Sequence, residues 1–402
     1  MANSGIFLAL ESVDQRVKSE RLALVCVCAV GFAFSANYTN HAPLAGTLMR
    51  QFGFNQTLAG LLTTGIFFTH AAMQLPGGHL VDRLGAPRVL TVALAWVAAG
   101  NFAIAFSGSY WQLLAWKVFL GLGTGTCFMA GARYIHDVLA TPRLTFGQGL
   151  YGGSILLGSG FVIFAVPRIS AWLGWRGAFL ISAAVAVAAW ILWVFAAPPA
   201  PPGERARGRF RDLLRTRQLW LLGLMQMASF GLAIVVGTWI TALLGNDFQM
   251  PGAKAGLAGS FVLLLGIGMR PLGGALRRLV GIQVLLSASF LMNALGCFAL
   301  ASGGHSLSLA VVAVGLIGTG CGLPYAALFT RAGSLVPGRA GAAMGLINVL
   351  GILMILVGAP LAGRLADRSG TFRSSFLALA IFSLVACAAV SLISRDEPTP
   401  SL

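Results

Sequence analysis

Charge is scarce in this sequence. Only 9% of its 402 residues are charged, whereas roughly a quarter are charged in an average soluble domain. Hydrophobic residues make up 57% of the chain, and the mean hydropathy is +0.84. A composition this apolar excludes an ordinary soluble domain and predicts an integral membrane protein.

Several patterns are missing as well. The alternating segments of about ten residues that build a transmembrane barrel do not occur. HExxH, P-loop and nucleophile-elbow patterns are also absent, so we expect no enzyme activity, no cofactor and no metal site. The loops contain no cysteine, which excludes a disulfide framework. The six cysteines all lie in apolar segments: Cys26, Cys28, Cys127, Cys297, Cys321 and Cys387.

Apolar segments about 20 residues long recur instead, each long enough to cross a ~30 Å hydrocarbon core as a helix. We predict an all-α integral membrane protein with twelve transmembrane helices. The predicted spans are 22–43, 56–79, 88–107, 111–136, 147–168, 177–197, 218–243, 254–276, 281–301, 306–329, 340–362 and 373–394. They form a first six-helix bundle (22–197) and a second (218–394), with an N-terminal tail (1–21), a Pro-rich basic linker (198–217) and a C-terminal tail (395–402).

Basic residues predict the orientation. The net charge is +16, but most of the Lys and Arg residues cluster in the segments between apolar runs, which argues against nucleic acid as a partner. With the N-terminus inside, the inner segments hold 17 Lys and Arg residues and the outer loops hold 7. The positive-inside rule then places both termini in the cytoplasm. We expect a monomeric, multi-pass protein of the plasma (inner) membrane, in contact with the lipid bilayer.

The chain also contains an internal repeat. Glycine ends four related segments, at Gly85, Gly174, Gly281 and Gly370, and each separation within a half is 89 residues. Each glycine is expected to mark the end of the second helix of a three-helix unit. Four such units, paired into two pseudo-symmetric halves, are typical of a transporter built from nested repeats.

The segment GGHLVDRLGAPR, at 77–88, resembles the cytoplasmic loop motif of the major facilitator superfamily. The matching residues are Gly78, Leu80, Asp82, Arg83, Gly85 and Arg88. The resemblance implies the major facilitator fold, and a gate in which the carboxylate of Asp82 pairs with basic groups at neighbouring helix ends. Arg133 is the expected partner, because opposite charges near helix ends can separate and re-form. A static salt bridge within the loop is the alternative.

The segment KVFLGLGTG, at 117–125, resembles a second motif of the superfamily, in which arginine precedes the glycines. Lys117 replaces that arginine here, which weakens any implied role in proton coupling. Two positions are open for this lysine, at the outer membrane interface or in the cavity. The glycines permit close helix packing.

Arg270 interrupts an otherwise apolar span. It lies seven residues before Arg277, so about 10 Å inside the expected cytoplasmic boundary. Every acidic residue of the chain lies in a loop, a tail or at a helix end. A cation at that depth should therefore face the bundle interior and be neutralised by an anionic solute. Snorkelling, or capping of backbone carbonyls, is the alternative.

The segment RPLGGAL around this arginine resembles the nitrate/nitrite porter group of the superfamily, where an arginine before a Gly-Gly pair binds the anion. That group carries a second arginine eight residues before the loop aspartate. Gln74 occupies this position here, opposite Arg270 in the pseudo-symmetry. The exchange suggests a different or larger anion than nitrate, such as a monocarboxylate.

Other polar residues within the spans are candidates to line a substrate site, because polar groups at that depth avoid lipid. They are Asn37, Tyr38, His41, His70, Tyr151, Tyr325 and Asn348. If transport is coupled to protons, His41 or His70 is the candidate, because histidine titrates near neutral pH. Interhelical hydrogen bonding is the alternative for the lone polar residues.

These observations predict a secondary active or facilitative transporter of a small anion, nitrate-like or a short carboxylate, that works by alternating access. One alternative is a proton-coupled efflux carrier for small lipophilic compounds. Another, from a different class, is a membrane sensor that does not transport.

Overall fold

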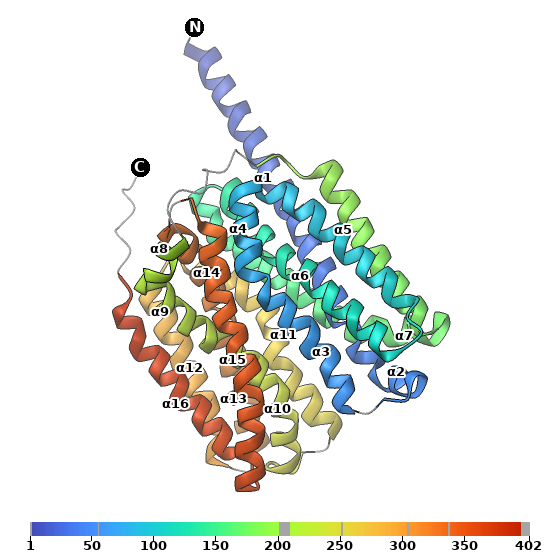
Figure 1. Cartoon of the computed structure of the whole chain (residues 1–402). Coiled ribbons are helices and arrows are strands. Elements are labelled where there is room, and N and C mark those ends of the chain that lie inside the picture. The colour runs from blue at the N-terminus through green and yellow to red at the C-terminus, as the bar shows by residue number, and fades with distance from the viewer. Residues whose placement is uncertain are drawn as a thin grey trace.

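The structure is a computed structural model that describes residues 2–54, 56–200, 210–250, 252–303, 306–336 and 338–394. All regular elements in these ranges are helices (Figure 1). The first half contains α1 (Ala2–Thr39), η1 (Ala42–Leu44), α2 (Ala45–Phe52), α3 (Gln56–Ala72), α4 (Gln74–Leu84), α5 (Ala86–Ala105), α6 (Tyr110–Val138) and α7 (Thr141–Ala196). The second half contains α8 (Phe210–Arg215), α9 (Arg217–Gln226), η2 (Met227–Gly231), α10 (Leu232–Asn246), α11 (Gly252–Leu276), α12 (Ile282–Ser302), α13 (Leu307–Gly322), α14 (Pro324–Leu335), α15 (Ala340–Ser369), α16 (Arg373–Ala389) and η3 (Val390–Leu392).

The predicted spans agree with these helices. Ten helical stretches in the described ranges are long and apolar enough to cross a membrane. The two remaining predicted spans are also helical: 56–79 consists of α3 and most of α4, and 147–168 lies in the first part of α7. The prediction of an all-α fold with twelve transmembrane helices is therefore confirmed.

Three of the four repeat glycines end helices, as predicted. Gly85 follows α4 with φ of 83°, and Gly370 follows α15 with φ of 71°. Gly174 breaks α7 into two helices with φ of 69°. Residues with a side chain rarely adopt these positive angles. Gly281 differs, because it has a negative φ and precedes the first residue of α12.

The helices pack into two bundles. In the first, α1 packs on α7 and α5 packs on α6; in the second, α12 packs on α13 and α16. Two helix pairs join the bundles most closely, α7 with α11 and α4 with α15. Figure 1 shows the blue-to-green helices on one side and the olive-to-red helices on the other. The start of α1 and the end of η3 lie at the same end of the molecule, which we call the termini end.

Glycines allow the two inter-bundle pairs to touch through their backbones. A Cβ atom at Gly78 of α4 would lie 2.6 Å from the carbonyl oxygen of Gly341 in α15. In the other pair, a Cβ at Gly149 of α7 would lie 2.4 Å from the carbonyl oxygen of Arg270 in α11. Real Cβ atoms do not approach this closely, so a side chain at either position would push the bundles apart.

The expected tails and linker fall only partly in the described ranges. The N-terminal segment that was predicted as a tail, 1–21, is helical from Ala2 onward and forms the first part of α1. The linker prediction, 198–217, includes 201–209, which lie outside the described residues, and the short helix α8 occupies 210–215 of the remainder. The predicted C-terminal tail, 395–402, also lies outside the described residues.

Candidate substrate site and gate

Arg270 lies in the second half of α11, against the glycine-rich face of α7. Its Nη1 donates a hydrogen bond of 2.7 Å to the carbonyl oxygen of Gly152. The guanidinium carbon lies 4.2 Å from the centre of the Tyr325 ring, which is close enough for a cation–π contact. The side chain of Tyr325 fits here because Gly152 has none: a Cβ at Gly152 would lie 2.2 Å from a ring carbon. The sequence GQGLYGGS thus makes room for the arginine and the tyrosine together.

The charge of Arg270 has no counter-ion in the described part of the chain. The residue is buried, at 5% exposure. The carboxylates of Glu20, Asp82 and Asp137 form ion pairs with Arg133 or Arg143 instead. Arginine has five N–H donors, and the bond to Gly152 uses one. An isolated buried charge is costly, so this guanidinium is suited to an anion that supplies the missing charge.

A cavity of about 750 Å³ lies between the two bundles, next to this arginine. It runs from Arg270 and Tyr325 to Ala42, beyond the end of α1, and to Leu257, near the start of α11. The cavity therefore extends toward the end of the molecule opposite the termini. Its other lining residues include Phe34, Tyr38, Phe67, His70, Phe128, Ile155, Leu156, Ser159, Phe230, Ile234, Leu263, Leu264, Ile267, Asn348 and Ile352.

Five of the predicted substrate residues meet at this cavity: Arg270, Tyr38, His70, Tyr325 and Asn348. The hydroxyl of Tyr325 is buried and has no hydrogen-bond partner. Nδ1 of His70 lies 3.0 Å from Oγ1 of Thr124. Oδ1 of Asn348 accepts a hydrogen bond of 3.4 Å from Gln226, which leaves the amide NH₂ of Asn348 available to a ligand.

The other four predicted substrate residues lie away from the cavity lining. Gln74 is fully buried at the contact of α4 with α15, and its amide donates to the carbonyl of His70 at 3.2 Å. Asn37 donates to Ala33 within α1. His41 bonds to Thr63 at 2.9 Å, and the hydroxyl of Tyr151 donates to backbone carbonyls of α6. All four side chains form their hydrogen bonds within the first bundle.

Lys117 occupies neither of the two positions considered from the sequence. It is fully buried inside the first bundle and does not line the cavity. Its Nζ donates to Oδ1 of Asn40 at 2.7 Å and lies 5.3 Å from the ring centre of Phe179. Asn40 in turn donates to Asn101 at 2.8 Å. The side chain is held by amide oxygens within its own bundle.

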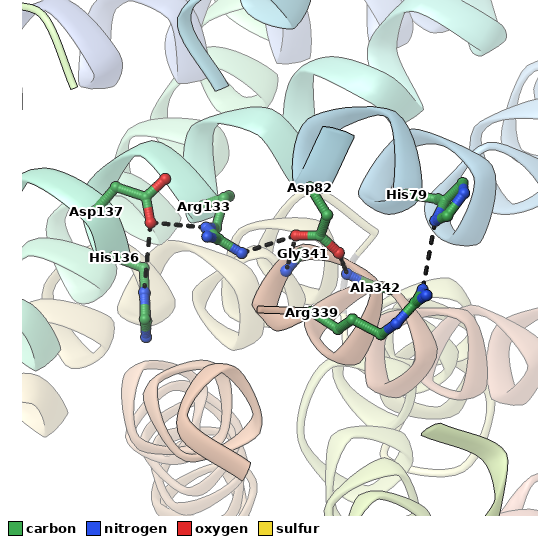
Figure 2. A network of polar contacts seen from close by, with 8 residues as sticks. All are labelled: His79, Asp82, Arg133, His136, Asp137, Arg339, Gly341 and Ala342. Carbon is green, nitrogen blue, oxygen red and sulfur yellow. Dashed lines mark hydrogen bonds and ion pairs between the residues drawn. The ribbon is translucent and has the colours of Figure 1, made fainter. Parts of the chain in front are cut away.

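At the termini end, Asp82 joins three helices (Figure 2). Its Oδ1 accepts a hydrogen bond of 2.7 Å from Nη1 of Arg133 in α6. The same carboxylate accepts from the backbone amides of Gly341 and Ala342, at 3.1 and 3.2 Å. Asp82 therefore caps the first turn of α15 in the opposite bundle, where amides have no partner within their own helix. Burial raises the pKa of Asp82, and Arg133 and the two amides act in the opposite direction.

The rest of the predicted gate surrounds this contact. Arg133 also bonds Asp137 at 2.7 Å through Nε. Gly78 touches the backbone of α15, and Gly85 ends α4. Arg83 and Arg88 are exposed. Asp82 thus binds across the two bundles and does not form only a local loop bridge.

Sequence reasoning identified Tyr38 and His70 but missed Phe34, Phe67 and Phe128, which complete the aromatic part of the cavity. Five rings lie in mutual contact, with centroids 5.2 to 6.4 Å apart in the pairs that join them: Phe34, Tyr38, Phe67, His70 and Phe128. We call these residues the aromatic cluster. The spacing of four between Phe34 and Tyr38, and of three between Phe67 and His70, places each pair on one helix face. That spacing was a usable signal. Ser159, which donates to the hydroxyl of Tyr38 at 3.3 Å, was also missed.

Comparison with known proteins agrees with this architecture. Among solved structures, FucP in the outward conformation superposes with a TM-score of 0.80 at 16% identity, covering 94% of this chain and 100% of that one. The human organic anion transporter MFSD10 gives 0.79 at 18% identity, covering 92% and 99%. These likenesses concern the fold.

Two curated relatives transport anions according to their names. The probable nitrate/nitrite antiporter NarK1 of Thermus thermophilus is 24% identical over 379 residues, which cover 84% of each chain. The probable sulfoacetate transporter SauU of Cupriavidus necator is 28% identical over 184 residues, covering 46% of this chain and 43% of that protein. A family model described as Major Facilitator Superfamily matches residues 27–358 and 283–402. The chain is a membrane transport protein of the Major Facilitator Superfamily.

Proposed function

We propose that this protein carries a small anion across the membrane by alternating access, with Arg270 as the residue that binds the negative charge. The relatives named for nitrate, nitrite and sulfoacetate support an anionic solute. Nitrate-like anions and short carboxylates are the proposed class. Uniport or exchange fits better than carboxylate-driven symport, because the cavity lining contains no acidic residue among the described parts of the chain.

The observation that carries this proposal is the environment of Arg270. Its guanidinium lines the cavity between the bundles, has no carboxylate partner among the described residues, and retains N–H donors beyond the one given to Gly152. A planar guanidinium binds oxyanions through two parallel hydrogen bonds. Binding of an anion removes the unpaired charge, and this lowers the cost of enclosing the site when the bundles close.

The gate supports an assignment of the side of the membrane to which the cavity opens. The bundles meet at the termini end through Asp82 and through the glycine contacts of α4 with α15, and the cavity extends the other way. If the termini are cytoplasmic, as the basic loops predict, this conformation is closed to the cytoplasm. We propose that opening to the cytoplasm requires the carboxylate of Asp82 to leave the first turn of α15.

Counterflow in liposomes tests the proposal. The purified protein is reconstituted, loaded with nitrate, acetate or butyrate, and supplied with the same labelled anion outside. We expect uptake by the unmodified protein and a loss of ten- to hundredfold in apparent affinity for Arg270→Gln, which corresponds to one charge-assisted hydrogen bond. Arg270→Lys keeps the charge but loses the planar fork, so it should retain part of the affinity.

Arg364→Gln provides the matched control. Arg364 is exposed near the end of α15 and does not line the cavity, so the same loss of charge should leave uptake unchanged. Undiminished uptake by Arg270→Gln would contradict the proposed role of this arginine. Absence of uptake for every anion tested, with correctly folded protein, would contradict anion transport itself.

A further inference from the structure

The walls of the cavity differ in chemistry from its charged end. Besides Arg270, the cavity lining offers a ligand the hydroxyl of Tyr325, which is buried without a partner, the hydroxyl of Tyr38, which accepts from Ser159 and keeps its own O–H, and the amide of Asn348. This set suits one anionic head group. Arg168 also lines the cavity, but it lies sixteen residues beyond Gly152 on α7, roughly 24 Å along the helix at 1.5 Å per residue, and therefore at the far mouth of the cavity.

The first bundle contributes the aromatic cluster to the wall. Phe34 and Phe128 meet edge to face with ring centroids 6.4 Å apart, and His70 lies 6.1 Å from Phe128. Aromatic side chains offer large apolar surfaces and favour edge-to-face contact with another ring. This wall is therefore suited to an aromatic or alkyl group of the ligand.

The second bundle contributes an aliphatic wall. Its aliphatic residues come from α10, α11 and α15, and they include Ile234, Leu263, Leu264, Ile267 and Ile352, while η2 adds the single ring of Phe230. The cavity of about 750 Å³ falls in the usual range of sites for drug-sized ligands, roughly 300–1,000 Å³. A strongly hydrated inorganic anion would exchange its water for these walls without gaining hydrogen bonds.

We infer that the preferred substrate is an organic monoanion with an apolar body, such as a medium-chain or aromatic monocarboxylate. This inference rests on the proposed function and narrows its substrate class. The carboxylate binds Arg270, and the apolar body lies between the aromatic cluster and the aliphatic wall. Because the two walls belong to different bundles, the body contacts both and favours their closure around it.

Direct binding to the purified full-length protein tests the inference. Titration calorimetry compares nitrate, acetate, butyrate, hexanoate and phenylacetate, with hexanol as the uncharged probe of the same length. Each buried methylene should raise the affinity about fourfold, so the four additional methylenes of hexanoate give an upper limit of roughly 250-fold over acetate, and we expect a gain of at least tenfold. Nitrate should bind weakly because it lacks the apolar body, and hexanol should bind weakly because it lacks the negative charge.

Two variants locate the apolar subsite. Phe128→Leu should reduce binding of phenylacetate several-fold while leaving acetate nearly unchanged. Ile234→Ser, in the opposite wall, should reduce binding of hexanoate several-fold and leave acetate nearly unchanged. This second variant provides the test if Phe128→Leu does not fold. Phe102→Leu is the matched control, because Phe102 is 55% exposed on α5 and does not line the cavity; it should change neither affinity.

The outcomes separate this inference from the proposed function. If nitrate binds more tightly than hexanoate and chain length has no effect, the inference is overturned while anion transport through Arg270 stands. If hexanol binds as tightly as hexanoate and Arg270→Gln changes nothing, both are overturned, and a carrier of lipophilic compounds takes their place.

Discussion

Gly152 offers a direct test of how Arg270 is held. In Gly152→Ala, the new Cβ would lie 2.2 Å from Cε1 of Tyr325 and 2.6 Å from Cδ1. Carbon atoms rest about 3.5–4.0 Å apart, so the ring must move by at least about 1.3 Å. The guanidinium of Arg270 lies 4.2 Å from the centre of that ring and must move with it. Overpacking of this kind typically costs about 1–3 kcal/mol of stability.

The displacement should also weaken anion binding. Loss of one well-placed charge-assisted hydrogen bond costs about 1.5–3 kcal/mol, or roughly ten- to hundredfold in Kd. Calorimetric titration with the tightest-binding anion measures the affinity, and thermal unfolding measures the stability. Gly268→Ala is the control, since a Cβ at Gly268 of α11 meets nothing within 4 Å. Unchanged affinity and Tm in Gly152→Ala would refute the packing argument.

Three further predictions concern the gate and the buried lysine. Asp82→Asn removes a buried charge partner and should destabilise this conformation by several kcal/mol. Spin labels on α4 and α15 should then report a larger separation between the two helices. An unchanged distance would contradict the role of Asp82 in holding the gate closed. Gly341→Ala places a Cβ 2.9 Å from the carbonyl oxygen of Gly78. Uptake should slow because α4 and α15 can no longer approach closely enough to close the gate. Lys117→Met leaves Oδ1 of Asn40 without its donor, which costs about 1–3 kcal/mol. The Tm should fall, while anion affinity stays the same because Lys117 does not line the cavity.

The sequence was sufficient for the helices and for the charged anchor points. Spans follow from apolar length, and helix ends follow from glycines such as Gly85 and Gly370, whose positive φ angles are rare for other residues. Arg270 and Asp82 stand out because a charge at depth or in a short motif has few tolerable environments. The contact of Asp82 with Arg133, present at 2.7 Å, was predicted from the resemblance of the loop motif to the superfamily and from opposite charges at neighbouring helix ends.

The direction in which a neutral side chain points could not be predicted equally well. Gln74 was expected opposite Arg270, yet it lies buried at the contact of α4 with α15. In a helix that is apolar on nearly every face, periodicity does not say which face meets the cavity. Packing decides this, and packing depends on residues of other helices, such as Gly345, whose missing side chain brings α15 onto the backbone of Gln74.

The bond from Arg270 to Gly152 joins a residue of one bundle to the backbone of the other. In this conformation, one of the guanidinium's N–H donors is therefore bound to the protein's own backbone. In the proposed alternating-access cycle, α7 and α11 would separate when the termini end opens, and the loss of the Gly152 carbonyl would free one N–H of Arg270 for the solute. The apparent affinity for the solute should therefore differ between the two sides of the membrane. It should be higher on the side to which this conformation is closed.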